Sequence, residues 1–117
     1  MPFEFVLEKL GRIDFTVKAF FGCHSIYVGE KILLTLRNKK EHTEDNGVWI
    51  ATEQEHHASL QKIFPSMRSI RVFGGASSNW QILPVDADDF EESVLLVCEM
   101  ILKNDLRIGK IPKKKKR

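Results

Sequence analysis

The stretch RIDFTVKAFFGCHSIYVGEKILLTL, residues 12–36, decides the fold class because it holds three short apolar runs separated by glycines. Over residues 12–19 apolar and polar side chains alternate strictly, which places Ile13, Phe15, Val17 and Ala19 on one face. A period of two residues is typical of a β-strand, in which successive side chains point to opposite sides of the sheet. We therefore predict a strand with one buried face here.

Two turns that contain glycine follow this strand. Gly22 permits a tight reversal, and Gly29-Glu30 separates two runs rich in β-branched and aromatic residues. A glycine that leads a two-residue loop between such runs indicates a β-hairpin. Both faces of this ribbon are partly apolar, as expected for central strands. The predicted cross-strand pairs are Tyr27 with Ile32 and Ile26 with Leu33.

The rest of the chain supplies three helices and three more strands. Each prediction follows from helical or alternating apolar spacing and from the glycines and prolines that bound it. The first two are a helix over residues 3–10 and a strand over 47–52, which follows the Asp45-Asn46-Gly47 turn. A Thr52–Glu55 capping box begins a helix over 53–64 with Leu60, Ile63 and Phe64 inward. A hairpin of 68–73 and 80–84 across the loop 74–79 follows, and then a helix over 88–103 whose stripe Phe90, Val94, Val97 and Ile101 is broadened by Leu95, Cys98 and Leu102.

The order of these elements predicts the fold class. Strands with no helix between them pair antiparallel, so the chain is expected to form an α+β two-layer domain with one antiparallel sheet of five or six strands. The order is helix, three strands, strand, helix, two-stranded hairpin, helix. A chain of 117 residues with 43% hydrophobic residues suits a single domain, which we assign to residues 1–109.

Composition indicates a reducing compartment. Two cysteines, Cys23 and Cys98, suit free thiols better than a disulfide framework. The first residues carry Glu4 and Glu8 and lack the apolar segment of a secretory signal. The apolar runs are also far shorter than the ~20 residues that cross a bilayer. We expect a cytoplasmic protein with no membrane contact.

The net charge of +2 hides a division along the chain. Residues 110–117, KIPKKKKR, hold six basic and no acidic residues, whereas the rest holds 12 basic and 16 acidic residues. We predict that 110–117 is a disordered basic tail that attracts phosphate backbones without sequence preference. A purely solubilising tail is the alternative. The candidate nucleic-acid-binding residues are Lys110, Lys113, Lys114, Lys115, Lys116 and Arg117.

Cys23 and His24 form the pair that first suggests chemistry. A nucleophilic cysteine needs a base within hydrogen-bond reach and a lowered pKa. Neighbours in a strand point to opposite faces, so these two side chains are not expected to meet. We predict a small buried residue at Cys23. The alternative is a small-molecule or cysteine-dependent site there, with His56 or His57 as the base.

No metal or cofactor site is predicted. Structural zinc needs four ligands, usually in paired short spacings, which the two cysteines and four histidines lack. Acidic residues near the last helix suit its N-terminal dipole rather than a calcium loop. They are Asp86, Asp88, Asp89, Glu91 and Glu92. The run GGASSN lacks the Gly-Lys-Ser/Thr ending of a phosphate loop, and a strand follows it.

The two tryptophans are expected to have different environments. Trp49 lies between Val48 and Ile50 and is predicted to pack in the core. Trp80 begins its strand beside a polar loop, which favours a rim or binding position. Together with Lys18, Cys23 and His24, it makes up the candidate ligand or partner face.

The run VKAFFGCHSIYVGEKILLTL resembles the start of TfoX-type N-terminal domains. Lys18, Phe21-Gly22, Tyr27-Val28 and Lys31 occupy the basic, Phe-Gly, Tyr-Val and lysine positions of that pattern, and Cys23 replaces its second glycine. The later GVWIAT and NWQILP runs follow the same order, which the MmcQ/YjbR-like proteins share. Over residues 3–103 the resemblance implies a two-layer fold related to secretion-chaperone-like folds. It also implies regulation or nucleic-acid binding rather than catalysis.

These observations together predict a small non-enzymatic binding module. Its partner is expected to be nucleic acid, contacted mainly by the tail, or a protein that contacts the sheet face or hairpin loops. The site near Cys23 is the alternative from another class. A sheet edge that pairs with a second copy would give a homodimer.

Overall fold

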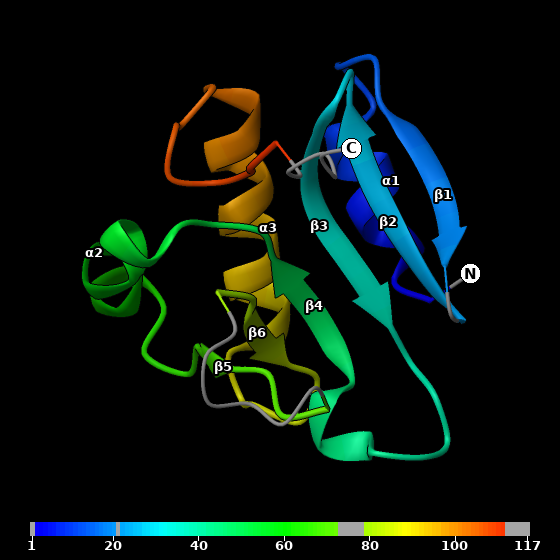
Figure 1. Ribbon diagram of the computed structural model, residues 1–117, viewed down its shortest axis with the longest axis vertical. Helices are drawn as coiled ribbons and strands as arrows, with labels where there is room; N and C mark the ends of the chain where they lie inside the picture. The colour runs from blue at the N-terminus through cyan, green and yellow to red at the C-terminus, as the bar shows by residue number, and fades with distance from the viewer. Residues whose placement is uncertain (1, 21, 73–78, 112–117) are drawn as a thin grey trace, which may run out of the picture.

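The computed structural model describes residues 2–20, 22–72 and 79–111, and within them a six-stranded antiparallel sheet packs against helices (Figure 1). The strand order is β1-β2-β3-β4-β6-β5, which confirms the predicted α+β class with one antiparallel sheet. The elements are α1 (Glu4–Leu10), β1 (Thr16–Phe20), β2 (Cys23–Val28), β3 (Lys31–Arg37), η1 (Thr43–Asp45), β4 (Gly47–Ile50), η2 (Gln54–His56), α2 (His57–Ile63), β5 (Arg68–Ser69), β6 (Gln81–Pro84) and α3 (Phe90–Leu102).

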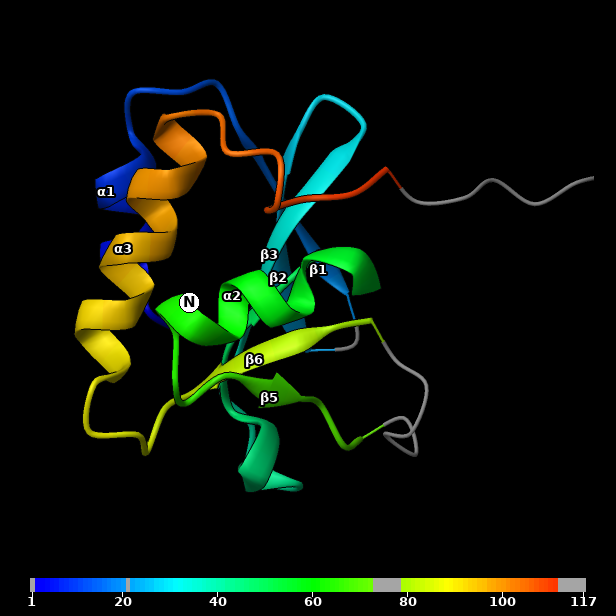
Figure 2. The ribbon, with the colours of Figure 1, turned by 90° about the vertical axis from the view of Figure 1, so that its left-hand side faces the viewer.

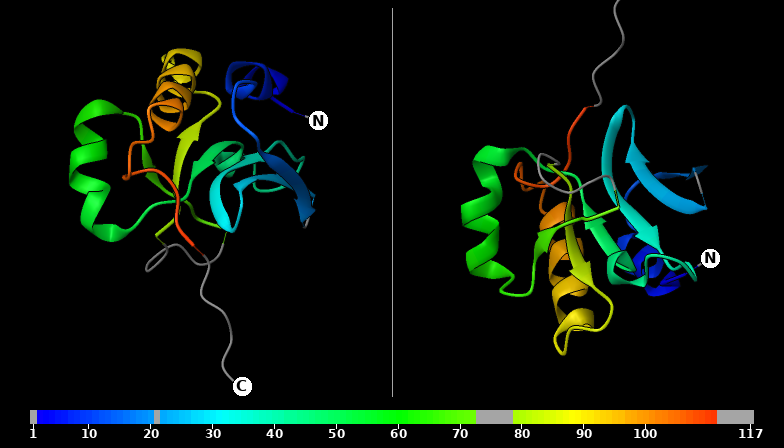
Figure 3. Two further views of the ribbon diagram at one scale, coloured as in Figure 1. Left: turned by 90° about the horizontal axis from the view of Figure 1, so that it is seen from above. Right: turned by 60° about the horizontal axis from the view of Figure 1, so that its bottom comes forward.

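The main core lies between the sheet and the two helices α1 and α3, which run side by side over one face (Figures 2 and 3). Alternation along the strands points every second residue toward these helices. A Lys9–Glu99 ion pair of 3.7 Å joins the two helices at the surface. The fully buried residues of this core include Val6, Leu10, Ile26, Leu34, Leu36, Val48, Ile50, Leu60, Phe64, Val94, Val97 and Cys98.

The first two hairpins have the predicted turns, with one shift in register. Gly22 has φ of +77°, a left-handed value that glycine adopts without strain. The prediction that Tyr27 lies opposite Ile32 is confirmed, but Ile26 lies opposite Leu34 and not Leu33. A β-bulge adds one residue to β3 here. Both consecutive leucines are thereby buried in the main core.

β1 is an edge strand, and its burial is shallower than the alternation predicts. The apolar residues Ile13, Phe15 and Val17 are partly buried, and their polar neighbours are exposed. Ala19, predicted to face inward, is exposed, and the strand begins only at Thr16. Strand β2 covers one side of β1, and no strand of the described residues covers the other.

The second helix begins differently from the prediction. Thr52 forms no capping box, because its hydroxyl donates to the carbonyl of Arg107 at 2.7 Å. The segment begins instead as the 3-10 turn η2 and becomes α-helical at His57. In α3 the stripe of Phe90, Val94, Val97 and Ile101 packs on the core as predicted, but Leu95 is 39% exposed and does not broaden it.

The chain after α3 folds back onto the sheet. Asn104 has φ of +63°, and the amides of Asn104 and Asp105 donate to the carbonyls of Ile101 and Met100. These bonds end the helix in the manner of a Schellman motif. Lys110 then pairs with Ile32 through two main-chain hydrogen bonds of 3.0 Å.

This pairing corrects the predicted boundary of the tail. Lys110 was expected to be disordered, but it belongs to the folded part because it forms an isolated antiparallel β-bridge with Ile32 at the start of β3. The other predicted tail cations (Lys113, Lys114, Lys115, Lys116 and Arg117) lie outside the described residues, as does most of the loop predicted over 74–79. None of the helices within residues 2–20, 22–72 and 79–111 has the length and apolar content needed to cross a membrane.

Candidate functional site

The face of the sheet opposite α1 and α3, called the outer face below, carries a second and smaller group of side chains. Thr35, Trp49 and Ile82 are lateral neighbours on this face, and Ser25 bonds Thr35 through their hydroxyls at 2.9 Å. Trp49 packs with Ile70 and Ile82, and Trp80 packs partly buried against this cluster. The outer face is therefore where buried polar groups and aromatic rings occur together.

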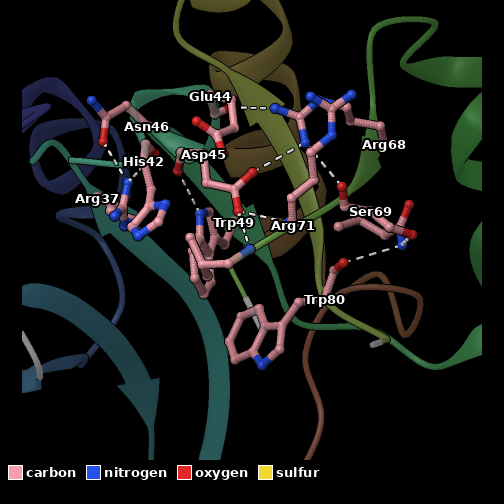
Figure 4. Close-up of polar contacts among 12 residues, drawn as sticks. Arg37, His42, Glu44, Asp45, Asn46, Trp49, Arg68, Ser69, Arg71 and Trp80 are labelled. Atoms are coloured by element: carbon pink, nitrogen blue, oxygen red, sulfur yellow. Dashed lines mark hydrogen bonds and ion pairs between the residues drawn. The ribbon is translucent and has the colours of Figure 1, made fainter. Parts of the chain in front are cut away.

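Asp45 is the centre of the polar contacts beside this face (Figure 4). Its side chain is fully buried, and Oδ1 accepts from Arg68 Nη1 at 3.1 Å. Oδ2 accepts from the backbone amides of Arg71 and Val72 at 2.6 and 2.7 Å. The carbonyl of Asp45 accepts from Trp49 Nε1 at 2.9 Å. One residue thus fixes residues 68–72, and through its own carbonyl it fixes the tryptophan.

A second buried group closes the loop before Asp45. Arg37 is 3% exposed, and its Nη1 donates to the carbonyl of His42 and to Asn46 Oδ1, both at 2.8 Å. Its Nη2 donates to the carbonyl of Glu41 at 3.0 Å. Asn46 also bonds both backbone groups of Lys39, at 2.9 and 2.8 Å. The loop between β3 and β4 is therefore closed by one guanidinium and one amide.

Gly47 is required where this loop meets the sheet. It has φ of +147°, and a Cβ there would collide with the carbonyl oxygen of Leu83 on β6. A glycine allows this close approach of two backbones. Asp45, Asn46 and Gly47, predicted as an ordinary turn, therefore form a buried junction of β3, β4 and β6.

The chemistry of the junction is structural. The two carboxylate oxygens of Asp45 accept three hydrogen bonds, all from residues 68–72, and its backbone carbonyl accepts a fourth from Trp49. A buried carboxylate whose two oxygens are bonded within the fold has a structural role, whereas a general base must come within hydrogen-bond reach of a substrate proton. The sequence feature that could have indicated this junction is Arg37, a cation that directly follows the apolar run KILLTL.

Cys23 and His24 lie at the start of β2 and are not brought together. Cys23 is buried on the outer face, in line with Ser25, whereas His24 lies on the other side beside Ala19 and Leu36. Burial raises the pKa of the Cys23 thiol, and the nearby charges of Arg37 and Lys39 oppose that rise without cancelling it.

Two other groups confirm that reactive atoms are shielded. Within the described residues, the Nδ1 atom of His24 is buried and has no hydrogen-bond partner. Cys98 is fully buried in α3, and desolvation raises its pKa to about 12. Neither cysteine forms a disulfide. The thiols are thus less nucleophilic at neutral pH than an ordinary exposed cysteine.

Lys18 and Trp80 belong to the outer face, as does Cys23. The Lys18 Nζ atom lies 4.8 Å from the centre of the Tyr27 ring, within the range of a cation–π contact. Trp80 packs edge-on against Trp49, with ring centres 5.7 Å apart, and stays partly buried at the rim as predicted. Of these four candidate residues, His24 alone lies on the opposite face of the sheet.

The helical histidines are engaged separately. His57 Nε2 lies 3.2 Å from the carbonyl of Asn79, and His56 Nε2 lies 3.5 Å from the carboxylate of Glu55. Across the part of the chain that the structure describes, no three His, Cys, Asp or Glu side chains gather closely enough to hold a metal ion. A cavity near the end of α3 is lined by none of Cys23, His24, Trp80 and these histidines.

Comparison of the chain with protein-family models, with curated proteins and with solved structures gave no match in any of the three. The resemblance to TfoX-type and YjbR-like domains therefore stays a prediction.

Proposed function

We propose that this chain is a small cytoplasmic, non-enzymatic binding module that contacts nucleic acid through its basic C-terminal run. The observation that carries the proposal is that this run starts from a fixed residue, Lys110, called its root below. The body of the domain, residues 1–109, has the opposite net charge. Residues 1–109 hold 12 basic and 16 acidic residues, and six cations follow within eight residues.

The root is held by main-chain bonds on two sides. Lys110 exchanges two hydrogen bonds with Ile32 on β3, and the amide of Gly109 donates to the carbonyl of Ala51. The Lys110 ammonium lies 3.9 Å from Glu53. Because Lys110 is held at the start of β3, a polyanion bound by the cations that follow it is expected to meet this side of the domain.

Electrostatics favour a contact that is non-specific. Each phosphate neutralised by a lysine or arginine releases condensed counterions, and this strengthens binding at low salt. The mildly acidic body repels the same polyanion, so binding by the body alone is expected to be weak. The prediction is tail-led binding with a steep dependence on salt.

The geometry also supports a binding role over cysteine chemistry. Burial raises the pKa of the Cys23 thiol, and His24 is on the opposite side of β2. A nucleophilic thiol would need a lowered pKa and a base in contact with it. The predicted kinship with TfoX-type domains agrees with this proposal because it implies binding rather than catalysis.

Fluorescence anisotropy with a labelled duplex and a labelled single strand tests the proposal. The full chain is compared with residues 1–111 and with a variant in which Lys113, Lys114, Lys115, Lys116 and Arg117 are all replaced by glutamine. Between about 50 and 200 mM salt, five neutralised phosphates predict a slope of log affinity against log salt of about −4.5 for the duplex and about −3.5 for the single strand. Both altered chains are expected to lose most of this slope.

The matched control neutralises exposed cations of the body. Arg12, Lys40, Lys62 and Lys103 are exposed, and replacing all four with glutamine leaves the terminal run intact. This control is expected to retain the salt slope of the full chain. Equal affinity of the full chain and residues 1–111 would refute tail-led binding.

A further inference from the structure

A cavity of about 250 Å³ lies between the tip of the β2–β3 hairpin and the end of α3. Its walls come from segments distant in sequence, because the chain after α3 folds back beside β3. The lining residues are Ile13, Val28, Lys31, Leu33, Ile101, Leu102, Asn104, Asp105 and Ile108. Six of these nine are aliphatic, so the interior of the cavity favours an apolar group.

The size of the cavity limits its ligand. An apolar protein cavity of about 150 Å³ holds a benzene molecule. A volume of about 250 Å³ therefore has room for roughly ten non-hydrogen atoms, such as a phenyl ring with a short chain. A nucleotide or a peptide helix is too large for it.

The charges in the cavity wall are unequal. Asp105 is already compensated, because Arg107 Nε and Nη2 donate to its two oxygens at 3.0 and 2.7 Å, and the Arg107 amide adds a third bond. This fork holds the pKa of Asp105 down at about 2. Lys31, in contrast, forms no ion pair or side-chain hydrogen bond with any described residue. The Lys31 ammonium is therefore a charge in the cavity wall that no oppositely charged group of the described residues pairs with.

The end of α3 adds little opposing charge. The C-terminus of a helix carries partial negative charge on its last carbonyls. Here the carbonyls of Met100 and Ile101 each accept a 2.9 Å hydrogen bond from the amides of Asp105 and Asn104. Those oxygens are engaged, and Lys31 is the only lysine or arginine among the nine lining residues.

We propose that this cavity binds a small monocarboxylate with an apolar body, whose carboxylate contacts the Lys31 ammonium while its hydrocarbon part packs on Leu33, Ile101 and Ile108. The site is separate from the terminal cations, so it goes beyond nucleic-acid binding and does not depend on it. Dissociation constants on the order of 1 mM are expected for a ligand of this size.

The test is a titration followed by amide ¹H–¹⁵N chemical shifts in the full chain. Three probes share one apolar body and differ in the head group: 3-phenylpropionate, 3-phenylpropanol and 3-phenylpropylamine. The propionate is expected to bind most tightly and to shift the amides of Ile13, Leu33 and Ile108. The amine is expected to bind most weakly because Lys31 repels it.

Two variants separate the roles of charge and space. Lys31→Met keeps the apolar stem, and it is expected to weaken the propionate about five-fold while leaving the alcohol unchanged. Val28→Trp places a large ring in the cavity wall and is expected to weaken all three probes. Val28 is 38% exposed at the end of its strand, so this variant has room to fold.

Lys103→Met is the matched control, because Lys103 is an exposed lysine that does not line the cavity. Its propionate affinity is expected to stay within about two-fold of the unaltered chain. The proposal is overturned if no probe shifts the cavity amides below about 10 mM. It is also overturned if the amine binds as tightly as the propionate, or if Lys31→Met and Lys103→Met behave alike.

Discussion

Replacing Asp45 with asparagine tests whether the buried junction holds the second half of the sheet in place. The substitution keeps the shape of the side chain but removes its charge and turns one acceptor into a donor. In the protein both oxygens accept, one from Arg68 and the other from the amides of Arg71 and Val72. An asparagine cannot accept at both positions, so at least one buried donor loses its partner.

The magnitude follows from these contacts. Loss of a charge-assisted hydrogen bond costs about 1.5–3 kcal/mol, and an unsatisfied buried donor adds about 1–3 kcal/mol. We expect the free energy of unfolding to fall by about 3–5 kcal/mol, in line with the cost of breaking a buried ion pair. That is a large part of the ~5–15 kcal/mol available to a domain.

Urea unfolding followed by tryptophan fluorescence provides the measurement. Trp49 is 4% exposed and donates to the carbonyl of Asp45, so its emission reports on this junction. Asp14→Asn is the matched control, because Asp14 is exposed and its side chain forms no hydrogen bond or ion pair with a described residue. It should change stability by less than about 0.5 kcal/mol. If Asp45→Asn lowers the free energy of unfolding by less than about 1 kcal/mol, the junction does not stabilise the sheet as proposed.

Three further outcomes are expected. The pKa of Asp105 is lowered from 3.8 to about 2, so its ionised form adds about 1 kcal/mol to the free energy of unfolding above pH 4. This stabilisation is lost as the pH falls toward 2. Asp105→Asn should therefore flatten that part of a curve of stability against pH. Gly109→Ala should destabilise the chain more than Gly29→Ala. Both glycines have positive φ, but only a Cβ at Gly109 meets side chains within 3 Å. The urea midpoints of the two variants give the comparison. Iodoacetamide should label Cys23 more slowly at neutral pH than an exposed cysteine and should label Cys98 only on unfolding, so rapid labelling at pH 7 would contradict the raised pKa values.

Local patterns were sufficient to predict most of the sheet and helices. Alternation along residues 12–19, glycine at the hairpin turns and the stripe along α3 all depend on near neighbours in sequence. The structure has a strand, the turns and a helix at these places, although the strand begins only at Thr16. The bulge opposite Ile26 was not predictable in this way. It brings Leu33 and Leu34 both into the main core, where Leu33 lies near Ile101 and Ile108, residues far from the strand in sequence.

The buried junction was missed for a related reason. Asp-Asn-Gly is favourable in an exposed turn, and nothing within the segment distinguishes that case from a buried one. Burial is imposed by residues 68–72, which lie 23 to 27 positions later and donate to Asp45. The same contacts shorten β5 to two residues, because the amides of Arg71 and Val72 bond the carboxylate.

The returning segment connects the two proposals without making them one. Ile108 lines the cavity, and two residues later Lys110 fixes the root of the basic run. A change that releases this segment, such as Gly109→Ala, would open the cavity and free the root together. Lys31→Met alters only the cavity charge, and neutralising Lys113–Arg117 alters only the run. Because each proposal has a variant that leaves the other intact, a shared loss identifies undocking of residues 105–110, and a separate loss identifies the individual site.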